Sequence, residues 1–110
     1  MRYYLIDELS GGDVKKAERF LKQNAVQSGI ENLFWIEIPE DRLNEIQSEH
    51  RDCHPYFFSV ELGTDWIKAE FFIRTLHNLN CACSGYCDRA QRRFISDYME
   101  GMVTESGIRT

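Results

Sequence analysis

The chain has 110 residues, of which 43% are hydrophobic and 28% are charged, a balance that indicates a single globular domain over residues 1–110 and excludes a disordered chain. Its formal net charge of −5 argues against a non-specific nucleic-acid binder, so we expect no nucleic-acid partner. No apolar run approaches the roughly 20 residues that span a bilayer, and the first residues are too acidic for a secretion signal. We therefore expect a cytoplasmic protein with no membrane partner.

The first half of the chain predicts two strands and two helices. Residues 2–9 alternate between apolar and polar side chains, which is typical of a strand. An S-x-x-D sequence beginning at Ser10 predicts the start of a helix whose apolar residues recur at helical spacing, and Gly29 predicts its end. Residues 32–38 predict a second strand, and Pro39 predicts the start of a short second helix.

The second half predicts a hairpin, a loop and a final helix. Residues 56–62 and 66–75 predict two strands joined by a short turn that contains a glycine. Residues 78–87 form a loop rich in cysteine. A D-x-x-Q sequence beginning at Asp88 then predicts the start of a C-terminal helix over about residues 89–104.

The expected element order is β-α-β-α-β-β-α. The first β-α-β unit predicts two parallel strands, and the hairpin adds antiparallel ones. We therefore expect an α+β fold, a two-layer sandwich with a mixed four-stranded sheet and its helices mainly on one face.

The second face of this predicted sheet is rich in aromatic side chains. Its large members are Trp35, Phe57, Trp66 and Phe72. Leaving so much apolar surface in water is unfavourable, which predicts either that the C-terminal helix partly covers the face or that a protein partner or a second copy does. Acidic residues on the same face argue against RNA stacking there.

All the cysteines and histidines lie beyond residue 49. The four cysteines are Cys53, Cys81, Cys83 and Cys87. In a reducing compartment we expect no structural disulfides. If the hairpin turn centres near Thr64, strand pairing places Cys53 near Thr75, at the end of the sheet where the cysteine-rich loop begins.

Four thiolates that approach one point suit a tetrahedral zinc ion. We therefore predict a zinc site formed by Cys53, Cys81, Cys83 and Cys87, with His54 or His77 as alternative ligands. The same cysteines could instead hold an iron–sulfur cluster, or remain partly buried thiols. A thiol-dependent redox protein that uses Cys87 at the start of the last helix is a further alternative. No other arrangement of residues indicates a reaction, so we expect a non-enzymatic binding or structural domain.

Several arginines accompany this end of the predicted sheet. They are Arg51, Arg74, Arg89, Arg92 and Arg93. They would either pair with nearby acidic side chains on the surface or form an anion site together with the first amides of the last helix.

Overall fold

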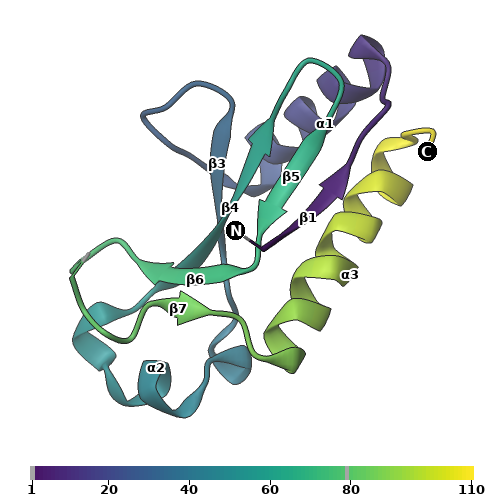
Figure 1. Ribbon diagram of the computed structural model, residues 1–110. Helices are drawn as coiled ribbons and strands as arrows, with labels where there is room; N and C mark the ends of the chain where they lie inside the picture. The colour runs from purple at the N-terminus through teal and green to yellow at the C-terminus, as the bar shows by residue number, and fades with distance from the viewer. Residues whose placement is uncertain (1, 79) are drawn as a thin grey trace.

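Helices and short strands alternate along the computed structural model, which describes residues 2–78 and 80–110 (Figure 1). The strands in this part of the chain are β1 (Tyr3–Ile6), β2 (Val26–Gln27), β3 (Leu33–Glu37), β4 (Tyr56–Leu62), β5 (Ile67–Glu70), β6 (Phe72–Thr75) and β7 (Gly85–Tyr86). The helices are α1 (Gly11–Asn24), α2 (Glu45–Glu49) and α3 (Arg89–Ser106), with short 3-10 turns η1 (Glu40–Arg42) and η2 (Arg51–Cys53). No helix within these described ranges is long and apolar enough to cross a membrane.

The strands form one curled sheet, in the order β1-β5-β4-β3-β2, with β6 paired to β4 and β7 paired to β6. Every observed pairing is antiparallel. The predicted α+β class is confirmed, but the mixed four-stranded sheet is wrong. β1 lies at the sheet edge beside β5, with β5 and β4 between it and β3, so the first β-α-β unit does not place two parallel strands side by side.

Three strands are additional to the four predicted. The strand β7 (Gly85–Tyr86) lies within the predicted loop 78–87 and pairs with β6, and two local features account for the other two. Helix α1 ends at Asn24 and not at the predicted Gly29, because Val26–Gln27 pairs with β3 as a short hairpin. The predicted strand 66–75 is also interrupted at Phe71, which separates β5 from β6. Val60 of β4 pairs with Ala69 of β5, and Tyr56 of β4 pairs with Thr75 of β6. Between these two pairs the chain advances four residues along β4 but six residues from β5 to β6. These two extra residues bend the sheet and direct β6 away from β1.

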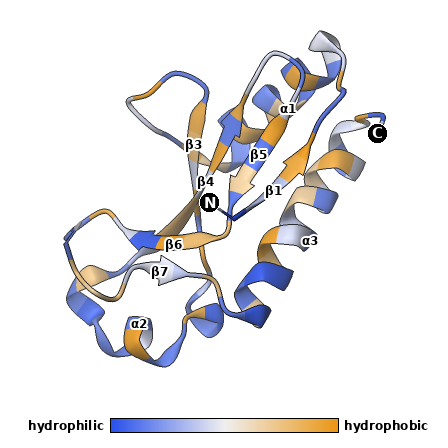
Figure 2. Ribbon diagram, viewed as in Figure 1, coloured by the Kyte–Doolittle hydropathy of each residue, from blue (hydrophilic) through white to orange (hydrophobic). Residues whose placement is uncertain are grey.

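Helices α1 and α3 pack on the same face of the sheet. Leu21 of α1 and Met99 of α3 are fully buried, and the ring of Phe58 on β4 makes edge contacts with Phe94 and Tyr98 of α3. In Figure 2, apolar colouring marks parts of β1, β3 and β5, and apolar and polar residues alternate along α3. Because α3 packs on the side of Phe58, it does not cover the opposite face, and that expectation is wrong.

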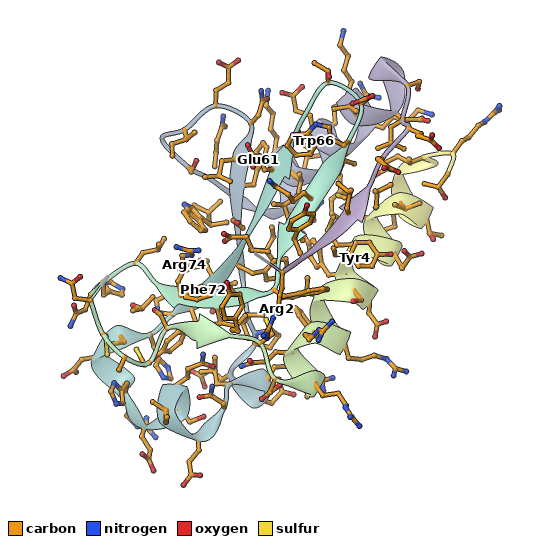
Figure 3. The ribbon with its side chains drawn as sticks, viewed as in Figure 1. Arg2, Tyr4, Glu61, Trp66, Phe72 and Arg74 are labelled. Carbon is orange, nitrogen blue, oxygen red and sulfur yellow. The ribbon has the colours of Figure 1, made fainter. Side chains whose placement is uncertain are left out.

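The opposite face, here called the open face, consists of strand side chains that neither long helix covers. It carries Tyr3, Leu5, Trp35, Glu37, Phe57, Ser59, Glu61, Trp66, Lys68, Glu70, Phe72 and Arg74. Figure 3 shows Glu61, Trp66, Phe72 and Arg74 on the near side of the sheet. The aromatic rings are half-buried among cations, since the Lys68 ammonium lies 5.2 Å from the Trp66 ring and the Arg74 guanidinium lies 4.8 Å from the Phe72 ring.

Candidate metal centre

Four donor groups from two distant segments meet at the end of β6. They are His50, which precedes η2, Cys53, the last residue of η2, and Cys81 and Cys83 of the cysteine-rich loop. Their four ligand atoms all lie within 4.8 Å of one another, and His50 Nδ1 is 3.2 Å from Cys81 Sγ. Cys53 and Cys83 are buried, whereas Cys81 lies nearer the surface. The predicted approach of Cys53 to the loop is therefore confirmed.

The first pair of donors is positioned by a tight turn. A capping box on Asn44 starts α2, His50 caps its C-terminal end, and the chain then continues as the 3-10 turn η2. The Cys53 amide donates to the His50 carbonyl at 3.0 Å. In a 3-10 turn, residues three apart point to the same side, so this turn brings the side chains of His50 and Cys53 together. Thr75 Oγ1 of β6 donates to the Cys53 carbonyl at 2.5 Å and holds the turn against the sheet.

The second pair lies on a loop that is tied to the same end of β6. The Ser84 amide donates to the Cys81 carbonyl at 3.3 Å, which closes a turn around Cys83. Ser84 Oγ also accepts from the Thr75 amide at 3.1 Å. Thr75 thus contacts both ligand-bearing segments. Leu79, within the predicted loop 78–87, lies outside the described residues.

A buried pair of glutamines connects the site to the start of α3. Gln47 and Gln91 are fully buried and belong to the capping boxes of α2 and α3. Gln91 Nε2 donates to Gln47 Oε1 at 2.8 Å, and Gln47 Nε2 donates to the Cys83 carbonyl at 3.2 Å. Buried amide groups are costly unless they are hydrogen-bonded, so this network favours one arrangement of the loop and both helix starts.

The thiols of the site differ in proton affinity. A hydrogen bond from the Cys83 amide, together with one from the Cys83 thiol, lowers the pKa of Cys81 to about 6 from an ordinary 9.0. Burial raises the pKa of Cys53 to about 12, and its hydrogen bonds to the neighbouring thiols act in the same direction. Burial raises the pKa of the Tyr56 phenol, and its hydrogen bond with the Cys83 thiol raises it further. The phenol therefore stays protonated and can donate a hydrogen bond beside the site. Without an ion, Cys53 therefore keeps its proton at neutral pH, and a bound divalent cation would displace that proton.

Cys87 is not part of this group. β7 runs antiparallel to β6 and carries the chain back along it, so that the Cys87 amide donates to the Phe71 carbonyl at 3.0 Å. Phe71 and Thr75 are four residues apart, a distance of about 13 Å along an extended strand. Burial raises the pKa of Cys87 to about 12, with the charge of Asp88 adding to the effect. A thiol with a raised pKa is a poor nucleophile, which does not favour the thiol-redox alternative.

The predicted alternative ligands His54 and His77 also lie outside the group. His54 Nε2 donates to the Gln47 carbonyl at 2.8 Å, and its Nδ1 lies 3.9 Å from Glu40. His77 follows β6 and is exposed, with its amide bonded to Thr75 Oγ1. The structure instead brings in His50, which the sequence interpretation did not select. The H-x-x-C spacing of His50 and Cys53 on a short turn is the signal that indicates it.

The five arginines do not gather at one point. Arg74 lies on the open face and pairs with Glu70 at 2.9 Å, and Arg93 lies 3.7 Å from Asp97. The Arg92 guanidinium lies 4.9 Å from the ring centre of Phe71. Arg89 is exposed on the first turn of α3, and Arg51 borders a surface depression beside His50. Arg74 and Arg93 thus pair with acidic side chains, as the surface-pair interpretation expects, and the anion site stays a prediction.

No known protein-family model matches the sequence, and no solved structure matches the chain. The chemistry of the His50, Cys53, Cys81 and Cys83 group is thus the basis for a functional conclusion. Imidazole and thiolate donors at this separation could hold one metal ion.

Proposed function

We propose that the protein is a small non-enzymatic binding or structural domain in which His50, Cys53, Cys81 and Cys83 hold one zinc ion. The observation that carries this proposal is the approach of the four ligand atoms to within 4.8 Å of one another. With Zn–S bonds of about 2.3 Å, the sulfurs of a tetrahedral site lie about 3.8 Å apart. Small side-chain adjustments are enough to bring the donors onto one ion.

The arrangement supports zinc over an iron–sulfur cluster. A cluster of several irons and sulfides needs ligands spread around a larger centre, usually four cysteine thiolates. Here the fourth cysteine lies at the other end of β6, and a histidine takes the fourth place beside three thiols. Three thiolates and one imidazole form a common structural zinc set.

Four protein ligands leave no open position on a tetrahedral ion, which is the property of a structural site and not of a catalytic one. The ion would fasten the turn around His50 to the loop around Cys83. Because Gln47 bonds the Cys83 carbonyl and also Gln91, the same fastening would extend to the first turn of α3. The zinc ion would thus stabilise a part of the chain that is rich in loops, where apolar packing alone contributes less.

The second part of the proposal concerns binding. The open face presents half-buried aromatic side chains, including Trp35, Phe57, Trp66 and Phe72, and no long helix covers it. We propose that a protein partner or a second copy binds there. The free cysteines of the chain are consistent with residence in the reducing cytoplasm.

Metal analysis of protein purified without chelator tests the zinc site. We expect one equivalent of zinc per chain, and no visible colour of the kind that iron–sulfur clusters give. Replacement of zinc by cobalt should give the visible absorption of tetrahedral thiolate coordination, which His50→Ala and Cys83→Ser should change and Cys87→Ser should not. Less than about a tenth of an equivalent of zinc in folded protein, or an unchanged cobalt spectrum in Cys83→Ser, would refute the site.

A further inference from the structure

The open face holds a trough beside a protruding apolar side chain. The trough has a volume of about 500 Å³, and its lining includes Leu33, Trp35, Ser59 and Lys68. Ile30, in the turn between β2 and β3, forms part of its rim and is 66% exposed, more than any other large hydrophobic side chain in the described residues. A knob and a hole thus lie next to each other on one surface.

The turn that carries Ile30 is held by its own hydrogen bonds. Ser28 Oγ accepts from the Ile30 amide at 3.0 Å and donates to the Ile30 carbonyl at 2.9 Å. The Leu33 amide also donates to the Ile30 carbonyl at 3.3 Å, and the Ser28 amide donates to the Leu33 carbonyl at 3.1 Å. Presenting an apolar side chain on an ordered turn reduces the entropy that binding costs.

The charges of the trough are balanced. Lys68 lies 3.5 Å from Glu61, and Arg74 lies 2.9 Å from Glu70, so two acids face two bases. Such a surface does not attract a strongly acidic or basic partner. It does match a surface of the same kind, because a twofold rotation can place the acids of one copy opposite the bases of another. The chain as a whole carries −5, so two copies approach each other with the least repulsion where their facing charges cancel.

We propose that two copies of this chain associate about a twofold axis through their open faces, each placing Ile30 in the trough of the other. A twofold interface uses the same patch on both copies, and a knob adjacent to its own hole satisfies that requirement. The same contact covers the ring of Trp35, which lines the trough, and brings the two open faces, with Trp66, against each other. This inference rests on the partner-binding part of the proposed function and not on the zinc site.

Sedimentation equilibrium of the zinc-loaded protein tests the dimer, over concentrations from about 1 μM to about 1 mM, which cover weak to moderate association. The mass of the wild type should rise from 13.0 kDa towards twice that value. Ile30→Asp should weaken dimerisation at least about tenfold, because it places a charge in an apolar contact. Ile46→Asp is the matched control, since Ile46 is 53% exposed but lies on α2, outside the open face. It should dimerise like the wild type.

Tryptophan fluorescence gives a second readout that needs no variant. Both tryptophans of the chain, Trp35 and Trp66, lie on the open face. Their emission should shift to shorter wavelength as the wild type is concentrated, and Ile30→Asp should lack the shift. A wild type that stays at 13.0 kDa throughout, or equal weakening by the two aspartate variants, would overturn the proposal. Either result would leave the zinc site intact, because metal content is measured separately.

Discussion

Replacing Gln47 by leucine tests whether the buried glutamine pair stabilises the link between the metal centre and α3. The Gln47 side chain is fully buried, and leucine has a similar volume, so no large cavity forms. The change removes the bonds of Gln47 Oε1 from the Asn44 amide at 3.1 Å and from Gln91 Nε2 at 2.8 Å, and the bond of Nε2 to the Cys83 carbonyl at 3.2 Å. At about 1 kcal/mol for each bond, and more for a buried group left without a partner, the free energy of unfolding should fall by about 3 kcal/mol.

Urea unfolding at a fixed zinc concentration measures this loss. With slopes of about 1–3 kcal/mol per molar urea for small proteins, the midpoint should fall by about 1–3 M. Gln23→Leu on the exposed side of α1 is the control and should change stability by less than about 0.5 kcal/mol. Gln91→Leu should also destabilise, and the double variant should lose less than the sum of the single losses, because the two residues share a bond. A loss below about 1 kcal/mol for Gln47→Leu, or strict additivity, would contradict the reasoning.

Three further predictions follow from single contacts. Cys83→Ser should lose zinc, and Cys87→Ser should keep one equivalent, as metal analysis would show. Cys83→Ser should also increase amide hydrogen exchange in the first turns of α3, which mass spectrometry of the exchanged protein would detect. Burial raises the pKa of Cys87 to about 12, so above about pH 9 the unfolded chain holds fewer protons at this thiol than the folded one. Stability should therefore fall as pH rises from about 9 towards 12, and an equally steep fall in Cys87→Ser would contradict this assignment. Gly63→Ala should destabilise the protein and alter tryptophan fluorescence, because a Cβ at this position would lie 2.0 Å from Trp66 Cε2. Gly101→Ala on α3 is the control, since a Cβ there meets no atom within 4 Å. In thermal unfolding, this control should be neutral or stabilising.

The parts of the fold that local patterns determine are those that the sequence predicts well. Strand β4 has the bounds expected from its alternation, and α3 begins after the capping residue Asp88. The order of strands in the sheet depends on contacts between distant segments, and alternation alone does not reveal these. The two-residue strand β2 is too short to show a period, and the interruption at Phe71 leaves the buried alternation of its neighbours unchanged.

The candidate site was predictable in part for a similar reason. Hairpin pairing is local enough to bring the start of β4 to Thr75, although Tyr56 and not Cys53 pairs with Thr75. The η2 turn then places the Cys53 carbonyl against Thr75 Oγ1, beside the cysteine-rich loop. The return of the chain along β6 as β7 removes Cys87 from the cluster, and this depends on a pairing of only two residues. His50 enters because a 3-10 turn follows α2, whereas a continuous helix would have oriented its side chain differently.

X-ray absorption at the zinc edge of the native protein tests the central claim most directly, because it reports the number and type of atoms bound to the ion. The proposed centre predicts three sulfurs at about 2.3 Å and one nitrogen at about 2.0 Å. Imidazole scattering should disappear in His50→Ala and persist in Cys87→Ser. A shell of four sulfurs, or protein that folds with no bound zinc, would contradict the proposed coordination by His50, Cys53, Cys81 and Cys83.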